Sequence, residues 1–354
     1  MILTARAPDK VTFLVTHRCN QSCGFCFDAS NVLAAGPATD MSAETFDRAL
    51  SLVSRSARDI PTFNITLSGG EPTLHRDFLR MVEQISKAGV SVTILSNGQA
   101  FADRRLMAEV LKFNVWNFQF SIEGASAEVH DRRVGSKGAW HKLLRAIENA
   151  KSLGARYVTN TTMTRSCIDE MFRVIDLLDQ LQVPKMNIGN TLPECAGRNH
   201  VAMMEYPEVV EIAEQLTLYA LTKRIAFSFI TPLPLCLKEN RVISNPSVCS
   251  AGQYSTVIDV DGRCKPCSVC DPSTGCPGIG KLATFADAGT ALEEVVNNAV
   301  RDDIPGECNA CSKRSACRAA CPLYWKVPGV TTPRAWKAAE NPARKGGLPS
   351  ATQA

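Results

Sequence analysis

The chain has 354 residues, of which 45% are hydrophobic and 21% charged, and its formal net charge is +4. These values are ordinary for a globular protein, and a positive charge this small and scattered gives no reason to expect a nucleic-acid partner. No apolar run approaches the ~20 residues that span a bilayer, and the first residues lack the features of a signal peptide. We therefore expect a cytoplasmic protein with no membrane partner.

Short β-branched runs alternate with helical patterns over the first 200 residues. We expect strands at Val11–Val15, Phe63–Leu67, Ser91–Leu95, Val115–Phe120, Arg156–Thr162 and Lys185–Gly189. Helical patterns lie between them, at Ala43–Ala57, Asp77–Ala88, Ala102–Lys112, Trp140–Leu153 and Asp169–Gln182. Asp40 or Ser42 can cap the first helix, and Gly89 and Gly154 stand where helices end. Six βα units predict an α/β fold, a partial (β/α)6 TIM-like barrel whose loops after the strands share one face.

The chain contains 15 cysteines, which is unusual for an intracellular protein. An odd number without an export signal argues against a disulfide framework, and clustered cysteines in the cytosol more often bind metal or do redox chemistry. Three lie within the first 26 residues and ten lie between Cys236 and Cys321. The distribution predicts two metal-binding regions around a scaffold with few cysteines.

The first cysteine cluster follows the first expected strand. Cys19, Cys23 and Cys26 have the spacing C-x3-C-x2-C. Three thiolates on one short loop suit an iron–sulfur cluster or a zinc ion. Because a structural site normally has four protein ligands, one metal position is open to a ligand from outside the protein.

Polar or glycine-rich turns follow the next strands. They are Gly69-Gly70-Glu71-Pro72, Ser96-Asn97-Gly98, Ser121-Ile122-Glu123-Gly124 and, after the sixth strand, the loop around Gly197-Arg198. Paired glycines allow the backbone to pass close to a ligand, and Glu71 adds a carboxylate beside them. Each turn alone has a purely structural explanation, but their recurrence at one edge of a barrel indicates a binding site.

In this order, the cysteine loop, the Gly-Gly-Glu-Pro turn and the Ser-Asn-Gly turn resemble the radical SAM superfamily over roughly residues 10 to 200. The segment 121–138 shares the resemblance through His130-Asp131, Arg133, Gly135 and Gly138. It implies that Cys19, Cys23 and Cys26 hold a [4Fe–4S] cluster whose remaining iron binds the amino and carboxylate groups of S-adenosylmethionine (SAM). It also implies SAM contacts from Gly69, Gly70, Glu71, Ser96, Asn97, Ser121 and Arg198. Phe25 would lie beside the adenine or serve as a core residue.

The second cysteine region begins at Cys249. We expect a hairpin with strands at Ser255–Val260 and Arg263–Cys267, a helix at Ala288–Ala299, and then the run C-x2-C-x5-C-x3-C from Cys308. Paired C-x2-C knuckles also occur in zinc ribbons. Together with C-x12-G-x4-C from Cys249 to Cys267, the run resembles the SPASM extension of radical SAM enzymes. This implies one or two auxiliary iron–sulfur clusters, one using Cys249, Cys267 and Cys321, the other using Cys308, Cys311 and Cys317.

The chain departs from the SPASM pattern because no cysteine follows Cys321. The missing ligand is to be sought among Cys236, Cys264, Cys270 and Cys276; alternatively, an open iron binds the substrate. We expect Cys167 and Cys195 to be buried thiols, although a position facing the substrate stays open for both.

The expected organisation has four parts. Residues 1–200 form the radical SAM core, and a helix and a strand-like run within 201–248 lead away from the barrel. Residues 249–325 form the SPASM domain, and 326–354, rich in Pro, Gly, Lys and Arg, form a flexible tail.

The resemblance implies an enzyme that cleaves SAM to a 5′-deoxyadenosyl radical, which abstracts a substrate hydrogen. An external one-electron donor such as flavodoxin or ferredoxin would supply the electron. Auxiliary clusters that accept the substrate's electron would give oxidation or cross-linking, whereas a thiol donor would give epimerisation. A ribosomally made peptide is the preferred substrate.

The alternatives are a sugar or aminocyclitol that is dehydrogenated, epimerised or decarboxylated in natural-product biosynthesis, and a non-catalytic zinc-stabilised binding protein. Ser268 stands where sulfatase-maturing relatives have Asp, which argues against that activity. Because the first strand starts near residue 11, a peptide substrate would need a separate recognition protein.

Overall fold

The structure is a computed structural model. It describes residues 10–34, 39–57, 63–190, 204–239, 241–244, 248–269, 275–300, 303–327, 329–333 and 335. Cys195, Arg198 and Cys270, and most of the expected tail, therefore lie outside the described residues.

A single sheet of nine strands organises the fold, in the order β7-β6-β5-β4-β3-β2-β1-β8-β9. The strands are β1 Lys10–Thr16, β2 Asn64–Gly69, β3 Ser91–Ser96, β4 Val115–Ser121, β5 Tyr157–Met163, β6 Lys185–Asn190, β7 Ala226–Phe229, β8 Ser255–Ile258 and β9 Cys264–Lys265. All neighbours pair in parallel except β8 and β9. The six strands expected in the barrel are all present, so the predicted α/β fold is confirmed.

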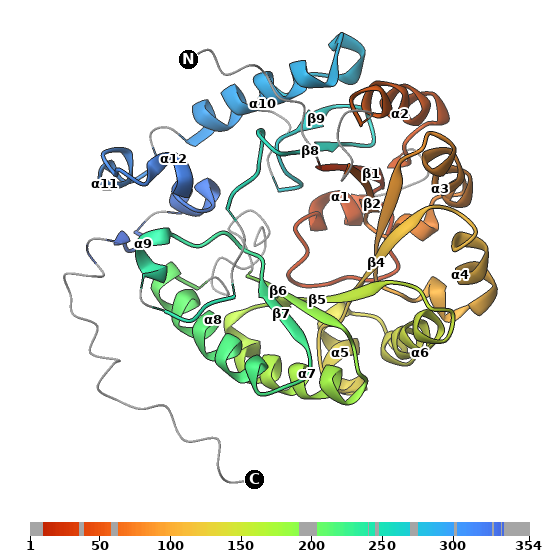
Figure 1. Cartoon of the computed structure of the whole chain (residues 1–354), viewed down its shortest axis with the longest axis horizontal. Helices are drawn as coiled ribbons and strands as arrows, with labels where there is room; N and C mark the ends of the chain where they lie inside the picture. Colours follow the sequence, from red (N-terminus) through yellow and green to blue (C-terminus); the bar gives the residue numbers. More distant parts are fainter. Residues whose placement is uncertain are drawn as a thin grey trace.

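Helices cover the outside of the curved sheet (Figure 1). The longer ones are α2 Ala43–Ala57, α3 Phe78–Lys87, α4 Arg104–Val110, α5 Ala127–Val134, α6 Ala139–Ser152, α7 Ile168–Gln180, α8 Tyr206–Leu221 and α10 Phe285–Val300. Short helices are α1 Ala29–Ala34, α9 Leu235–Lys238, α11 Gly306–Asn309 and α12 Arg314–Cys317. Their apolar faces cause this arrangement: α3 buries Phe78, Met81, Val82 and Ile85, the spacing of one helical stripe.

The sequence left open which residue caps α2, and the structure decides it. Ser42 Oγ accepts the backbone N–H of Thr45 at 3.1 Å, as an N-cap does. Asp40 instead binds Arg18 in the cysteine loop. Gly89 and Gly154 follow α3 and α6 with φ of 76° and 68°, as expected for helix C-termini.

The segment after β6 differs from the expectation. We expected residues 205–230 to lead away from the barrel, but β7 pairs in parallel with β6, from Lys185 opposite Ala226 to Ile188 opposite Phe229. The reason is burial: Phe227 and Phe229 are almost inaccessible to solvent, and only the sheet edge can cover such a short strand. The helix α8 therefore acts as a further crossover of the barrel.

The expected hairpin is present as β8 and β9, and it also extends the sheet. β8 pairs in parallel with β1, from Lys10 opposite Ser255 to Phe13 opposite Ile258. The cysteine-rich C-terminal region is thereby joined to the strand that precedes the first cysteine loop (Figure 1). Within the described residues, no helix is both long and apolar enough to cross a membrane.

Candidate active site

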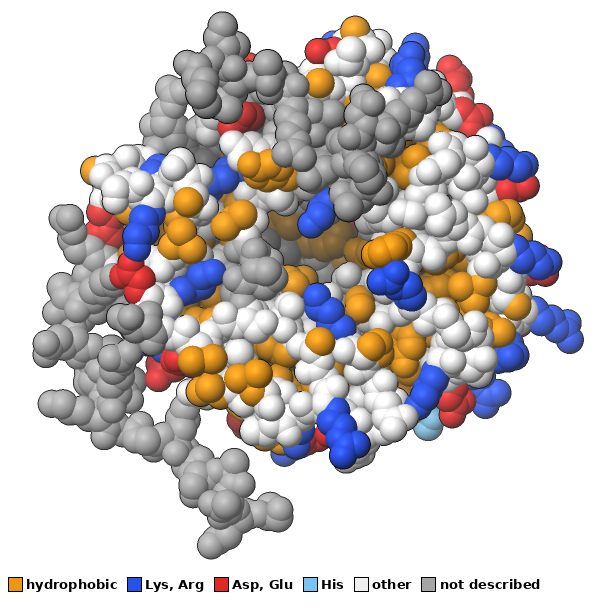
Figure 2. Space-filling model, in the orientation of Figure 1, with side chains coloured by type: hydrophobic (Ala, Val, Ile, Leu, Met, Phe, Trp, Pro, Cys, Tyr) orange, Lys and Arg blue, Asp and Glu red, His pale blue; other side chains and the backbone are white. Residues whose placement is uncertain are grey.

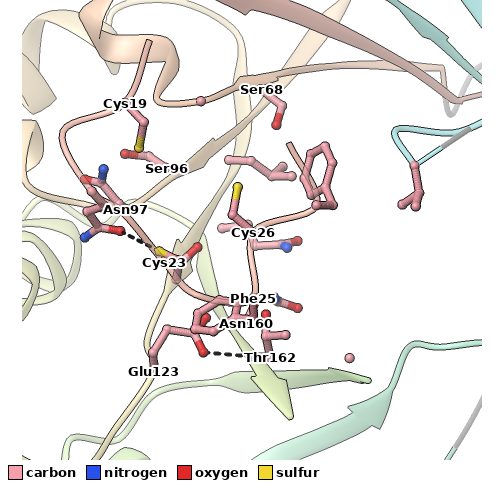
Figure 3. Close-up of a pocket in the computed structure, with 18 of the residues that line it drawn as sticks. Cys19, Cys23, Phe25, Cys26, Ser68, Ser96, Asn97, Glu123, Asn160 and Thr162 are labelled. Carbon is pink, nitrogen blue, oxygen red and sulfur yellow. Dashed lines mark hydrogen bonds between the residues drawn. The ribbon is translucent and has the colours of Figure 1, made fainter. Parts of the chain in front are cut away.

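A cavity of about 420 Å³ lies where the parallel strands end. Figure 2 shows a hollow near the centre of this face. The loops after β1, β2, β3 and β4 contribute eight of the residues named from the sequence, namely Cys19, Cys23, Cys26, Gly69, Gly70, Ser96, Asn97 and Ser121. The sulfur atoms of Cys19, Cys23 and Cys26 turn toward a common space (Figure 3).

The cysteine loop is fixed at its start by a charged anchor. Arg18 donates two hydrogen bonds to Asp40, at 2.9 Å from Nε and 2.6 Å from Nη2, and Nη2 also donates to Leu74 O at 2.6 Å. Paired hydrogen bonds of this kind fix orientation as well as distance. Thr16 Oγ1 donates to the same carboxylate at 2.5 Å. The loop that presents Cys19 is therefore held by Asp40, which precedes α2, and by the turn after β2.

Gly69 and Gly70 are required for contact with the cysteine loop itself. A Cβ on Gly69 would lie 2.2 Å from Thr16 O, and a Cβ on Gly70 would lie 2.3 Å from Arg18 O. Gly70 N–H donates to Thr16 O at 2.7 Å, and Glu71 N–H donates to Arg18 O at 2.8 Å. The sequence predicted close approach to a ligand; the structure shows that the two glycines also let β2's turn bind the loop of β1.

Glu71 lies behind the wall of the cavity. It is 2% exposed, and its carboxylate accepts the Asn97 backbone N–H at 2.7 Å and Ser96 Oγ–H at 2.9 Å, as well as two donors of Thr73. Burial raises the pKa of this carboxyl above its ordinary value, although these hydrogen bonds lower it in part. Glu71 is not among the residues that line the cavity. Its carboxylate therefore positions Ser96 and Asn97, which do line the cavity.

Glu123 is a buried carboxyl on the cavity wall to which the sequence analysis gave no role. It is 2% exposed, its Oε2 accepts the Thr162 backbone N–H at 3.0 Å, and Arg133 Nη2 lies 3.4 Å from it. Burial raises the pKa of Glu123 to about 7, although the charge of Arg133 opposes the shift. Arg133 also lies over the Phe25 ring, 5.0 Å from its centroid. The only signal in the sequence was its place in the turn after the fourth strand.

Three amide side chains on the cavity wall have a polar atom without a protein partner. They are Gln21 Nε2, Asn160 Oδ1 and Asn190 Oδ1. Buried polar atoms in native proteins are nearly always bonded, so these three are available to a bound ligand. Asn160 lies within β5 and Asn190 is the last residue of β6. Neither was predicted from the sequence as a site residue.

The three thiols suit a cluster better than a single ion. Burial raises the pKa of Cys19 to about 11 and also raises the pKa of Cys23 and Cys26. Burial thus favours the neutral thiols, and a bound metal would displace their protons. Within the described part of the chain, no three Cys, His, Asp or Glu side chains are arranged around one metal ion. Their spacing would suit a cluster, to which Cys19, Cys23 and Cys26 would each supply one thiolate.

A buried network of charged groups joins the cysteine loop to the C-terminal hairpin. His17 Nδ1 lies 2.6 Å from Asp28 Oδ2, on the far side of the loop, and His17 Nε2 lies 3.4 Å from Asp259 Oδ1, after β8. Lys265 Nζ, on β9, lies 3.3 Å from Asp259 Oδ2. Burial lowers the pKa of His17, but the hydrogen bond and charge of Asp28 outweigh it, so the pKa is raised. The histidines showed no ligand spacing in the sequence, and His17 is indeed paired with carboxylates.

The remaining cysteines fall into separate groups. Cys321 interacts electrostatically with Cys249 and Cys267, and Cys308 with Cys311 and Cys317, as the sequence grouped them. Cys236 joins the second of these groups, whereas Cys264 lies beside Cys276.

Cys167 does not line the cavity. It is 6% exposed, and its Sγ accepts the Thr164 backbone N–H at 3.2 Å. The expectation of plain burial is confirmed for Cys167, and the structure offers no support for its role as a hydrogen donor to a substrate.

Comparison with known proteins agrees with this site. Residues 13–178 match the model of the radical SAM superfamily. The PqqA peptide cyclase of Ruegeria pomeroyi is 25% identical over 325 residues, covering 88% of this chain and 81% of that protein.

Solved structures share the fold. Streptococcus suis SuiB bound to precursor peptide SuiA has a TM-score of 0.69 at 14% identity, covering 92% of this chain and 76% of SuiB. The structure of anSMEcpe with bound AdoMet has a TM-score of 0.69 at 16% identity, covering 94% of each chain. Residues 13–178, which carry the three thiols and the turns after β2, β3 and β4 around this cavity, therefore form a radical SAM domain.

Proposed function

We propose that this protein matures a ribosomally made peptide by radical chemistry. The observation that supports the proposal most directly is one cavity that combines three thiols with polar groups of the five strands β2 to β6. Cys19, Cys23 and Cys26 would hold an iron–sulfur cluster, which would supply the electron for the cleavage of SAM to methionine and a 5′-deoxyadenosyl radical. The protein's own part is to place the reactants and to exclude water and other hydrogen donors.

The residues of the cavity fit SAM. The zwitterionic methionine end and the ribose need polar partners, and Ser96, Asn97 and Ser121 line the wall beside the cysteine loop. The unpartnered Oδ1 atoms of Asn160 and Asn190 are acceptors for hydroxyl or amino groups. Phe25 offers an aromatic face to the adenine. Arg198 stays a proposed SAM contact, because it lies outside the described residues.

The C-terminal region supports auxiliary clusters in a SPASM domain, for which we keep the bounds 249–325. Two groups of cysteines, around Cys321 and around Cys308, lie beyond the strand pair that joins β8 to β1. Clusters there would accept the electron left on the substrate radical, so that the net reaction is an oxidation or a cross-link. An external one-electron donor such as flavodoxin or ferredoxin, in the cytoplasm, would reduce the first cluster.

A peptide substrate is favoured by two relatives. One is named PqqA peptide cyclase, and the other, SuiB, was solved with a precursor peptide. A separate recognition protein would present the peptide to the open face in Figure 2. The sugar or aminocyclitol substrate is the outcome to expect if no peptide is turned over.

The cofactor assignment is tested by anaerobic purification of the full chain. We expect a brown protein containing iron and sulfide that releases 5′-deoxyadenosine from SAM under reductant. The Cys19→Ala/Cys23→Ala/Cys26→Ala variant should lose this activity. A colourless protein containing zinc would establish the non-catalytic alternative, and SAM cleavage by the triple variant would disprove the role of the loop.

The substrate class is tested with short peptides encoded beside the gene. Mass spectrometry after reaction should show the loss of a pair of hydrogen atoms, and tandem spectra should locate the new bond. Turnover of a sugar by the same preparation, with every such peptide unchanged, would favour the small-molecule reaction.

A further inference from the structure

A second cavity lies beside the short helices of the C-terminal region. Its lining includes four thiols, of which three come from one segment and the fourth, Cys236, from α9, some seventy residues earlier in the chain. The three from one segment are Cys308, Cys311 and Cys317. Cys308 interacts electrostatically with each of the other three thiols, Cys236, Cys311 and Cys317. The four thiols thus face one space although the sequence separates them.

The fold brings α9 to this space by specific contacts. The backbone N–H of Leu235 donates to Cys317 Sγ at 3.4 Å, and Lys313 forms an ion pair with Glu239, just after α9. Backbone N–H groups commonly donate to the sulfur ligands of iron–sulfur clusters and tune their potential. The contact is therefore of the kind that such a site requires.

An aromatic cluster supports the other side of the cavity. Trp325 lines the cavity, and its Nε1–H donates to Ala319 O at 2.8 Å. Tyr206, at the start of α8, packs on Trp325 with centroids 5.3 Å apart, and its hydroxyl accepts the Cys321 N–H at 2.9 Å. The cysteine-rich segment is in this way held against the barrel's own helix α8.

The charges around the cavity suit a negatively charged group. Lys313 and Arg314 line it, and Lys238 interacts electrostatically with Cys317. Four thiolates around an iron–sulfur core carry net negative charge, which nearby cations stabilise. The thiols thus have the electrostatic surroundings of a cluster.

A left-handed turn separates this group from Cys321. Arg318, Ala319 and Ala320 have φ of 53°, 58° and 61°, values that residues with a side chain rarely adopt. Arg318 holds the turn by donating to Cys249 O at 2.6 Å and to Ala251 O at 3.1 Å. Cys317 therefore faces α9, while Cys321 faces Cys249 and Cys267.

We propose that Cys236 completes a four-thiolate site with Cys308, Cys311 and Cys317, taking the place of the ligand that the chain lacks after Cys321. The assignment rests on the proposed auxiliary clusters. The rival Cys264 is fully buried on β9 beside Cys276 and does not line the cavity.

The test uses the full chain with Cys19→Ala/Cys23→Ala/Cys26→Ala, in which only auxiliary clusters remain. Adding Cys236→Ala should remove about half of the remaining iron and sulfide, or leave a three-iron cluster visible by electron paramagnetic resonance. Cys264→Ala is the control and should keep the iron of the parent. Circular dichroism checks folding, and Cys236→Ser, whose hydroxyl can still ligate, should keep iron with an altered spectrum.

The outcomes are separable. Unchanged iron and an unchanged spectrum in Cys236→Ala would overturn the assignment of this ligand alone. Loss of iron in Cys264→Ala instead would transfer the role to Cys264. If the parent variant Cys19→Ala/Cys23→Ala/Cys26→Ala binds no iron, the auxiliary clusters do not exist, and the proposed site is overturned with them. The radical SAM assignment would not be affected by that result.

Discussion

Lys265 Nζ lies 3.3 Å from Asp259 Oδ2, and both side chains are only 4% exposed. Asp259 in turn contacts His17, two residues before Cys19. A buried ion pair contributes little net stability over apolar residues of the same shape, yet removing one partner leaves an uncompensated charge. The ion pair therefore holds Asp259 in place within the hairpin, and the contact of Asp259 with His17 links the hairpin to the first cysteine loop.

Lys265→Met should lower the free energy of unfolding by up to about 3–5 kcal/mol, because the buried Asp259 then keeps only its contact with His17. Urea denaturation of the metal-free chain measures it. Arg263→Met is a matched control on the same hairpin: its ion pair with Asp261 is exposed, so the change should stay within about 1 kcal/mol. Similar small effects in both variants would contradict the buried coupling.

Glu123→Gln should change how stability depends on pH. The folded-state pKa of about 7 lies above the ordinary value of a glutamate, so the folded chain binds the proton more tightly. This carboxyl therefore stabilises the fold below its unfolded pKa and loses that contribution as pH rises through about 7.

Between pH 5 and 8 the free energy of unfolding of the native chain should fall, relative to Glu123→Gln, by up to about 3 kcal/mol. Denaturant titrations of both metal-free proteins across this range provide the comparison. Parallel pH profiles would show that Glu123 titrates at its ordinary pKa.

Gly70→Ala should disrupt the first cluster site. The new Cβ would lie 2.3 Å from Arg18 O, a backbone atom that cannot give way without moving the cysteine loop. We expect a loss of stability of about 2 kcal/mol or more and reduced iron content after anaerobic reconstitution.

Gly24→Ala is the control for this variant. Gly24 lies between Cys23 and Cys26, but a Cβ there meets no atom within 4 Å. Its stability and iron content should match the parent. Equal iron in both variants would mean that the contact between Gly70 and Arg18 does not position the loop.

Glu71→Gln should weaken SAM binding without touching SAM. The amide retains one acceptor oxygen and turns an N–H₂ group toward donors that the carboxylate now accepts, including Asn97 N–H at 2.7 Å. The free energy of unfolding should fall by about 1–3 kcal/mol. Because Asn97 shifts, the Kd for SAM should rise roughly tenfold or more. Calorimetry with the reconstituted protein measures the Kd, and Glu44→Gln, on the exposed face of α2, should leave it unchanged.

Much of the barrel followed from the sequence because its signals are local. Runs of β-branched residues and 3.6-residue periodicity placed all six expected strands and the helices between them. The spacing of Cys19, Cys23 and Cys26 and the turns after the strands indicated the site, since parallel strands bring their ends to one edge. These features need no knowledge of long-range packing.

Tertiary structure alone decided which distant groups meet. The sequence could not show that β7 and β8 extend the sheet, because a short strand takes its partner from burial and not from its own pattern. Nor could it show that Glu71 is buried behind Ser96 and Asn97, or that Glu123 is buried deeply enough for its pKa to reach about 7. The sequence determined the chemistry of the thiols, and packing determined that Cys236, among the candidates that the structure describes, lines one cavity with Cys308, because only the folded chain brings α9 beside that segment.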